Sequence, residues 1–416
     1  MPRTVSRADV RPGRSLAILT VAHAFNHAQV AVLPLVYLAL IEQWGVSVST
    51  IAFITAADSL LSGATQLSFS GLTRRFSRRT ILGVGNIVLG IGMAAQALAA
   101  SIVPFGIANV ISKMGASQQH PVGNGLLAEQ FPIDRRGFAI AVHVAGGNIG
   151  SVLVPLVGAW LIAGVGWGWT VVLFGIPPLC IGVAMLVLLR EAGTDRLAAI
   201  EAGSLASAFR AVLRDRDLWL ILLVSFLGAA SRGLGILNVF LPLYLKIVLG
   251  VDDGTIALML TVLLLGSIPG PVVAGRLSDR FGRKPVIMGV YAGGAVGIVL
   301  LLVAGSNALL LWPSVLLLGA FSFVESPQLQ ALLADVAKPA LRDASFSVYF
   351  TLAFGIGALW TAVYGAITGS MGDAAGLPVI LWVMAFASVA AALAAIPIRV
   401  HSRLAAARAA EAAGEG

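Results

Sequence analysis

Four charged residues lie inside apolar runs that are long enough to cross a membrane. Two of them are acids, Asp58 and Glu325, and two are bases, Lys113 and Arg232. A charge at the centre of a membrane-spanning helix costs about 2.5–3.5 kcal/mol on insertion scales, so such residues usually have a partner and a function. A buried acid can take up and release a proton, whereas a base can bind an anion or pair with an acid. Asp58 and Glu325 are therefore candidates for proton coupling, and Lys113 and Arg232 are candidates for substrate binding.

The positions of these four residues along their runs predict two ion pairs. Asp58 lies about eight residues from the outer end of its run and Lys113 about nine, so both lie roughly 12–14 Å deep at about 1.5 Å per residue. Arg232 and Glu325 each lie near the middle of a run. We expect an Asp58–Lys113 pair and an Arg232–Glu325 pair. A static structural role stays open for the first pair, whereas Pro327, which frees backbone groups in mid-span, favours a functional role for Glu325.

Polar side chains also recur at helical spacing on two of the runs. One stripe consists of His23, Asn26 and His27, and the other consists of Lys113, Ser117, His120 and Asn124. Such a stripe should face a neighbouring helix or a water-filled cavity. Because imidazole titrates near neutral pH, His27 and His120 are further candidates for proton coupling. A hydrogen-bonded packing role is the alternative for each histidine, and it is the role that we expect for His143.

The other candidates for substrate binding are polar or aromatic side chains within the runs. They are His23, Asn26, Gln119, Asn124, Gln328, Tyr349 and Trp360. Tyr349 and Trp360 belong to an aromatic stripe that could line a cavity, and a core or lipid-facing role is the alternative. The two histidines on the first run could bind a metal ion, but their spacing alone is weak support. We therefore predict no metal site and no cofactor.

Twelve apolar runs carry these residues. Hydrophobic residues make up 58% of the 416 residues and charged residues only 11%, whereas about a quarter of a soluble domain is charged. A membrane-spanning helix needs about 20 mostly apolar residues, and the runs of that kind lie near 15–41, 50–70, 80–101, 104–130, 137–163, 168–189, 218–245, 254–275, 285–305, 308–336, 344–368 and 376–398. We predict an all-α membrane protein with twelve transmembrane helices in two six-helix bundles. The bundles cover 15–189 and 218–398, with a cytoplasmic arm at 1–14, a linker at 190–217 and a tail at 399–416.

The basic residues lie almost entirely on one side of these runs. Of the 27 Lys and Arg residues, 24 fall in the arm, the linker, the tail and the loops after runs two, four, eight and ten. Because cytoplasmic loops are rich in Lys and Arg, both termini should be cytoplasmic. The net charge of +8 therefore reflects topology and contact with anionic lipid, and it does not indicate a nucleic-acid partner. The first run resembles a secretory signal, but it continues to Ile41, so we expect no cleavage.

The two halves of the chain resemble each other at a nearly constant offset. Matching residues recur after 205 to 208 positions within Leu33–Leu35 and Leu241–Leu243, Val46–Ala52 and Val251–Ala257, Phe76–Arg78 and Phe281–Arg283, and Leu126–Glu129 and Leu332–Asp335. A chance match is the alternative for any single segment, but the shared offset favours a true repeat. Two parallel repeats of six spans are the plan of secondary transporters in which two bundles rock around a central site.

The loop after the eighth run carries a specific motif. It reads Gly275-Arg276-Leu277-Ser278-Asp279-Arg280-Phe281-Gly282-Arg283-Lys284, and it resembles the signature loop of the major facilitator superfamily. The resemblance implies a transport function and a conformational latch formed by Gly275, Asp279, Arg280, Gly282 and Arg283, which holds the two halves in the outward-open state. In the first half, Ser70, Arg74 and Ser77 replace the first glycine, the acid and the second glycine. We interpret Arg74 as a topology charge.

A narrower resemblance concerns the fourth and fifth runs. The residues are Gln119-His120-Pro121, then Gly146-Gly147-Asn148-Ile149-Gly150-Ser151 and Pro155. This pattern is similar to the fosmidomycin-resistance branch of the superfamily, which contains proton-driven exporters of a phosphonate antibiotic. Val122 stands where that branch has an acid. The alternative interpretation of the glycines is close helix packing by small residues.

The residues and the resemblance together predict a proton-coupled secondary transporter of the inner membrane that exports a small organic solute, with Lys113 and Arg232 favouring an anion. An importer or a uniporter on the same fold is the first alternative, and a non-transporting membrane receptor is the second. The sequence has no phosphate-binding loop and no supported catalytic set, so we predict that the chain is not an enzyme. The expected partners are the solute, protons and membrane lipids, and the expected state is a monomer.

Overall fold

The regular elements of the chain are helices. The computed structural model describes residues 10–191, 210, 213–336 and 342–399, and no strand occurs within them. Eight helices of this part of the chain are long and apolar enough to cross a membrane, or nine if one bent pair counts as a single span. Several predicted spans are broken in the middle or run into the next one, so helices and spans do not correspond one to one. The predicted arm, linker and tail lie mostly outside the described residues.

The first half of the chain begins with long helices, and its fourth and fifth predicted spans are interrupted. Its elements are α1 (Pro12–Trp44), α2 (Val48–Arg75), α3 (Arg78–Ala95), η2 (Gln96–Leu98), α4 (Ile102–Ala116), η3 (Gln119–Gly123), α5 (Asn124–Gln130), α6 (Ile133–Val152) and α7 (Val154–Leu188). The interruption between α4 and α5 is a π-helical turn that contains Pro121, which has no N–H to donate. Gly166 bends the backbone within α7 with a φ of 80°, a value that glycine adopts without strain, and it separates the fifth predicted span from the sixth.

The second half contains interruptions in its seventh, eighth and tenth predicted spans. Its elements are α9 (Arg216–Gly228), η5 (Ala229–Ser231), η6 (Gly233–Leu237), α10 (Asn238–Ile247), α11 (Asp253–Leu265), α12 (Pro269–Phe281), α13 (Arg283–Ala304), α14 (Ala308–Phe321), α15 (Glu325–Val336), α16 (Arg342–Met371) and α17 (Asp373–Ala394). The seventh span bends by 46° between Ser231 and Gly233, and the tenth is interrupted by a turn before Glu325. The two breaks are joined, because the N–H of Gly233 donates to the carbonyl oxygen of Ser322 at 3.0 Å.

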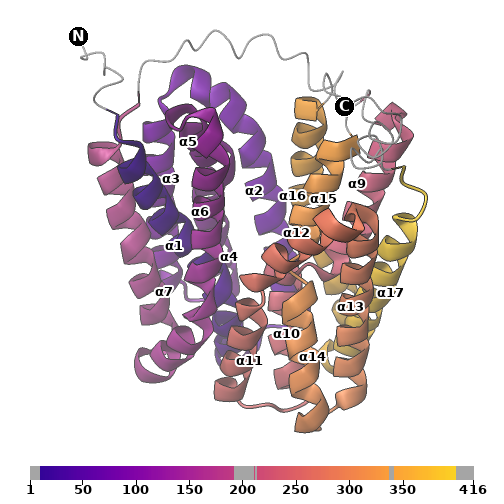
Figure 1. Cartoon of the computed structure of the whole chain (residues 1–416). Helices are drawn as coiled ribbons and strands as arrows, with labels where there is room; N and C mark the ends of the chain where they lie inside the picture. The colour runs from indigo at the N-terminus through magenta and orange to yellow at the C-terminus, as the bar shows by residue number, and fades with distance from the viewer. Residues whose placement is uncertain (1–9, 192–209, 211–212, 337–341, 400–416) are drawn as a thin grey trace, which may run out of the picture. The chain divides into compact units, whose positions relative to one another are not determined.

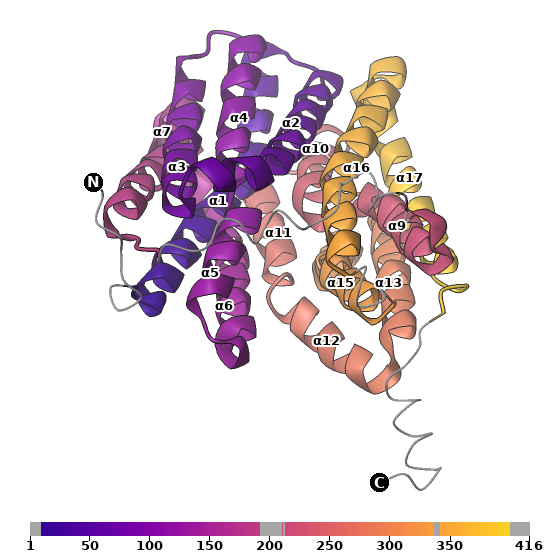
Figure 2. The ribbon, with the colours of Figure 1, turned by 90° about the horizontal axis from the view of Figure 1, so that it is seen from above.

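Contacts divide the chain into two units. Unit 1 comprises residues 1–201, 238–265 and 357–377, and unit 2 comprises residues 202–237, 266–356 and 378–416. Within unit 1, α1 lies beside α6, and α3 lies beside α4 and α7, as Figures 1 and 2 show. Within unit 2, α13 lies beside α14 and α15. Unit 1 therefore includes α10, α11 and the end of α16 in addition to the first half of the chain.

Glycines allow helices of unit 1 to pack closely. A Cβ atom added to Gly90 on α3 would lie 2.5 Å from the carbonyl oxygen of Gly175 on α7, and one added to Gly150 on α6 would lie 2.5 Å from Cα of Ala24 on α1. A Cβ atom on Gly147 would lie 3.0 Å from the His23 ring. Close approach at small residues is a common means of helix association in membranes. The glycines of the fifth predicted span thus pack α6 against α1.

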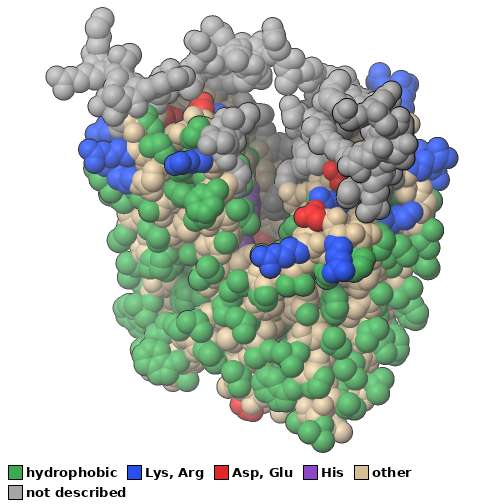
Figure 3. Space-filling view, in the orientation of Figure 1, with side chains coloured by type: hydrophobic (Ala, Val, Ile, Leu, Met, Phe, Trp, Pro, Cys, Tyr) green, Lys and Arg blue, Asp and Glu red, His purple; other side chains and the backbone are tan. Residues whose placement is uncertain are grey.

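The surface has the character expected of a membrane protein. Large apolar side chains are exposed, among them Trp160, Leu309 and Phe386, and Figure 3 shows hydrophobic side chains along the flanks of the helices. Lys and Arg side chains gather at one end of the helices in the same view. Apolar flanks with a basic end are the pattern that the positive-inside rule describes for helices in a bilayer.

Candidate functional site

Glu325, Arg232 and Tyr291 form a hydrogen-bonded group in unit 2. Arg232 Nε donates to Glu325 Oε1 at 2.7 Å, which is the ion pair expected from the sequence. The Tyr291 hydroxyl donates to Glu325 Oε2 at 2.8 Å. Only 5% of the Glu325 side chain is exposed. Both carboxylate oxygens therefore have a donor, and this offsets part of the cost of burying the charge.

The two charged residues lie where their spans are broken. Arg232 follows η5 at the bend of the seventh span, and Glu325 is the first residue of α15. The N-terminus of a helix has unpaired N–H groups and a partial positive charge, which favours an acid at this position. Breaks of this kind are found where backbone at membrane depth lines a protein-enclosed site.

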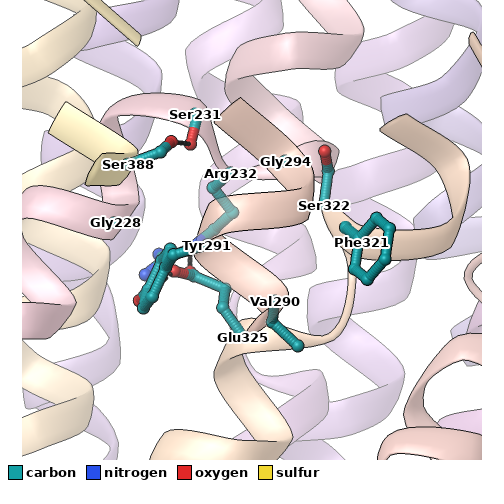
Figure 4. Close-up of a pocket in the computed structure, with 10 residues that line it drawn as sticks. All are labelled: Gly228, Ser231, Arg232, Val290, Tyr291, Gly294, Phe321, Ser322, Glu325 and Ser388. Carbon is teal, nitrogen blue, oxygen red and sulfur yellow. Dashed lines mark hydrogen bonds and ion pairs between the residues drawn. The ribbon is translucent and has the colours of Figure 1, made fainter. Parts of the chain in front are cut away.

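A small polar cavity adjoins the ion pair. The lining side chains with polar atoms belong to Ser231, Arg232, Tyr291, Ser322, Glu325 and Ser388, and Figure 4 shows them with the hydrogen bonds and the ion pair that join them. The hydroxyls of Ser231 and Ser388 lie 2.7 Å apart. The cavity has room for about one water molecule. It can therefore hold water beside the carboxylate, but it is too small for an organic substrate.

Gly228 on α9 provides the space for this group. A Cβ atom at this position would overlap the Tyr291 hydroxyl and would lie 2.5 Å from Glu325 Oε2. A side chain at position 228 would therefore displace the tyrosine or the carboxylate.

Unit 1 also contains a buried acid, Asp58. It lies on α2 with 3% exposure, and its Oδ2 accepts a hydrogen bond from Asn109 on α4. Its Oδ1 has no hydrogen-bond partner in the described residues. Lys113 interacts with Asp58 electrostatically, but no direct ion pair joins the two side chains within the part of the chain that the structure describes. The direct contact comes from Asn109, whose Nδ2 also lies 3.3 Å from the Tyr37 hydroxyl.

The structure brings four predicted intramembrane histidines together in unit 1. The ring of His23 lies 4.6 Å from that of His27, 4.8 Å from that of His120 and 4.5 Å from that of His143, measured between centroids. Three different elements supply these side chains: α1, η3 and α6. The sequence analysis singled out each of the four histidines, but only the fold shows that their side chains lie together.

The remaining predicted substrate-binding residues occupy different environments. Asn26 donates to the carbonyl oxygen of Ala116 at 2.8 Å, and Gln119 donates to that of Leu19 at 3.0 Å. Oδ1 of Asn124 and Oε1 of the buried Gln328 have no hydrogen-bond partner in the described residues.

The two aromatic candidates lie in different units. Tyr349 lies in the apolar core of unit 2 and interacts with Arg232 and Glu325 electrostatically. The half-buried Trp360 lies in unit 1, with its ring 6.0 Å from that of Tyr364. The two residues of the predicted aromatic stripe therefore lie in different environments, Tyr349 in the core and Trp360 at a more exposed position.

The signature loop links α12 to α13. Gly282 has a φ of 95° between the two helices, which explains the need for glycine there. Arg283, the first residue of α13, pairs with Asp279 at 2.7 Å and with Asp335 on α15 at 3.2 Å. Arg280 lies over the Phe281 ring at 5.2 Å, and a Cβ atom on Gly275 would meet nothing within 4 Å. The loop is thus held to α15 through Arg283.

The same ion pair occurs in the first half of the chain. Arg78, the first residue of α3, pairs with Glu129 on α5, as Arg283 pairs with Asp335. These are corresponding positions of the sequence repeat, so the repeat holds at the level of individual ion pairs. The repeat places Arg78 opposite Arg283 and Glu129 opposite Asp335 in the alignment of the two halves. It did not predict that each arginine pairs with the acid of its own half.

A third group of charges lies at the end of α1 and between α10 and α11. Lys246 contacts Glu42 and Asp253, each at 2.8 Å. Next to this group, hydrogen bonds from Thr255 hold the pKa of Asp252 below its usual value. Glu42 belongs to the first half of the chain and Lys246 to the second, so the pair joins the two sequence repeats within unit 1.

Comparisons with known proteins agree with this architecture. The model of the Major Facilitator Superfamily matches residues 19–360 and 230–414. The chain is 27% identical to the cis,cis-muconate transport protein of Acinetobacter baylyi over 55% of this chain and 56% of that protein. It is 25% identical to the fosmidomycin resistance protein of Escherichia coli over 85% of this chain and 86% of that protein. The crystal structure of a D-xylose–proton symporter has 18% identity and a TM-score of 0.76, covering 92% of this chain and 97% of that chain.

The chain belongs to the Major Facilitator Superfamily, a family of membrane transport proteins, and it is a multi-pass membrane protein. The chain spans a little over half of the length of some curated relatives that it matches, such as the muconate transport protein.

Proposed function

We propose that the chain is a proton-coupled secondary transporter that exports a small organic anion across the inner membrane. It works as a monomer with both termini in the cytoplasm, among membrane lipids. The transport cycle alternates between conformations that open to opposite sides, and a ligand or a proton that prefers one of them shifts the equilibrium.

The buried Glu325 site carries this proposal. A carboxylate with two hydrogen-bond donors, one of them an arginine, lies beside a cavity that accommodates about one water molecule. Water at this position gives a proton a route to the acid. Movement of either broken span would separate Arg232 from Glu325, and an unpaired buried carboxylate is stabilised by taking up a proton.

Asp58 supplies a second proton-binding position. It is as buried as Glu325, but one of its oxygens lacks a donor in the described residues. A protonated carboxylic acid has one O–H and needs fewer donors than a carboxylate. We infer that Asp58 is a second position at which a proton can be held.

The choice of an anion rests on Lys113 and Arg232, which are cations within the spans. It is also supported by similarity to a protein named for the transport of muconate, a carboxylate. The export direction is supported by similarity to the fosmidomycin resistance protein over most of both chains.

The proposal is tested with the purified chain in liposomes that carry an imposed pH gradient. Radiolabelled carboxylates, phosphonates, sugars and lipophilic cations are offered in turn, with protein-free liposomes as the control. We expect flux of an anion that depends on the gradient and that moves against the proton flux. Co-directional movement would indicate an importer, gradient-independent flux a uniporter, and ligand binding without flux a receptor. A preference for cations would contradict the assignment of the substrate class.

A further inference from the structure

The histidine group of unit 1 has the composition and the geometry of a metal site. His23 and His27 lie one helical turn apart on α1, and His120 lies in the π-helical turn η3. One nitrogen from each of the three rings can be chosen so that all three lie within 4.8 Å of one another. π-Helical turns inside a helix are often found at functional sites. One face of α1 thus supplies two imidazoles and the helix break at η3 supplies the third, so that the three rings converge.

The hydrogen bonding of His23 leaves one ring nitrogen available. Its Nδ1 lies 2.9 Å from the carbonyl oxygen of His143. A carbonyl oxygen only accepts, so Nδ1 carries the hydrogen and Nε2 has a free lone pair. Metal-bound histidines typically donate their other N–H to a carbonyl or carboxylate, which fixes the tautomer and the ring orientation. Gly147 on α6 provides the space for this ring, because a Cβ atom there would lie 3.0 Å from it.

The free nitrogens of this group are buried without partners. His23 Nε2 and His27 Nδ1 have no hydrogen-bond partner in the described residues. A buried polar atom that lacks a partner costs about 1–3 kcal/mol. Two neighbouring rings, 4.6 Å apart between centroids, thus each have a nitrogen that is free to bind a ligand.

We propose that His23, His27 and His120 form a binding site for a divalent transition-metal ion, with Zn²⁺ as the reference ion. Neutral imidazole suits Zn²⁺, Cu²⁺, Ni²⁺ and Co²⁺, whereas Mg²⁺ and Ca²⁺ require oxygen ligands. Zn–N bonds of about 2.0–2.1 Å in a tetrahedral site place the nitrogens roughly 3.4 Å apart. Side-chain rotations that bring the nitrogens closer by up to about 1.4 Å complete the site, and three protein ligands leave a fourth position for water.

The surroundings of the site are compatible with a cation and with entry from outside. The base Lys113 acts on His27 electrostatically, and the acid Asp58 acts on Lys113 with the opposite charge. His27 and His120 are only half-buried. An ion can therefore reach the ligands without unfolding of the helices.

The test uses the full chain purified without a polyhistidine tag and equilibrated with buffered Zn²⁺. We expect one Zn²⁺ per chain by elemental analysis, and His27→Ala and His120→Ala should each weaken binding by at least about tenfold. The matched control is His401→Ala, which changes the one histidine that does not belong to the cluster of four and should leave Zn²⁺ binding unchanged.

A second measurement does not depend on the stability of variants. Co²⁺ added to the wild-type chain should give the visible absorption of a tetrahedral complex with nitrogen ligands, and Zn²⁺ should displace it. Failure of the wild type to retain a stoichiometric ion would overturn the proposal. Equal retention in His27→Ala and His120→Ala, or loss in His401→Ala, would also overturn it.

Discussion

At the scale of single residues, the two buried acids differ in how completely their oxygens are hydrogen-bonded. Glu325 receives one donor on each oxygen, from Arg232 and Tyr291. Asp58 receives one from Asn109, and its other oxygen has no partner in the described residues. Two acids in unlike environments can be protonated at different stages of a cycle.

Removing Arg232 should destabilise the chain more than removing both partners of the pair. Arg232→Gln leaves Glu325 buried without its cation, and breaking a buried pair costs about 3–5 kcal/mol. The double variant Arg232→Gln with Glu325→Gln should recover part of this loss. The measurement is the midpoint of thermal unfolding in detergent for the wild type, both single variants and the double variant. A double variant as unstable as Arg232→Gln would show that the pair does not have this role.

At the scale of the elements, the candidate sites coincide with breaks in the spans. His120 lies in η3, Arg232 at the bend before η6, and Glu325 at the start of α15. Backbone groups released at such breaks need other partners, and the bond from Gly233 to Ser322 supplies one. The seventh and tenth spans are therefore coupled beside the ion pair.

A methyl group at position 228 should disturb this arrangement. Gly228→Ala places a Cβ atom where the Tyr291 hydroxyl and the Glu325 carboxylate lie, and overpacking of this kind costs about 1–3 kcal/mol. Transport in liposomes should fall strongly. Gly289→Ala on α13 is the matched control, because its Cβ atom would meet nothing within 4 Å. Equal activity of the two variants would count against a functional role for the packing at Gly228.

The sequence predicted the spans, the repeat and most polar residues of the sites, because apolar runs and isolated charges are local signals. Partner identity was harder to predict. Depth alone suggested that Asp58 contacts Lys113, whereas Asn109 makes the direct contact. A signal for Asn109 existed, since it lies four residues before Lys113 and on the same helix face. Tyr291 had no such signal, because an aromatic residue in an apolar run resembles any core residue.

At the scale of the whole molecule, the ends of the two sequence repeats are joined on the side opposite the signature loop in the predicted topology. Lys246 contacts Glu42, Asn238 donates to the carbonyl oxygen of Val30, and Asp373 accepts from the N–H of Val48. Each contact lies within unit 1 and connects the first half of the chain to the second. The alternating-access cycle proposed above predicts that these contacts break when this end opens.

Holding this end closed should stop transport. In a Cys180→Ser background, cysteines at Glu42 and Lys246 are joined by a cleavable bifunctional thiol reagent. We expect flux to fall to the level of protein-free liposomes after cross-linking and to return after cleavage. Each single-cysteine variant is the control for modification alone. Full transport by the cross-linked chain would mean that this end does not open.

The orientation in the membrane is open to a direct test. In the same background, Ser306→Cys after α13 should react with a membrane-impermeant thiol reagent added outside the cell. Arg75→Cys at the end of α2 should react only after the membrane is permeabilised. Both positions are exposed, so a difference in labelling reports the side of the membrane. The reverse pattern would contradict cytoplasmic termini.

The most direct test of proton coupling compares two modes of transport in liposomes for the wild type, Asp58→Asn and Glu325→Gln. A carboxamide imitates a permanently protonated acid, so each variant should retain substrate exchange at equal pH. Accumulation driven by a pH gradient should fall strongly, because a carboxamide can neither take up nor release a proton. Asp252→Asn, the same change at an exposed acid, is the control and should leave both modes intact. Normal gradient-driven accumulation by both Asp58→Asn and Glu325→Gln would contradict proton coupling through these buried acids.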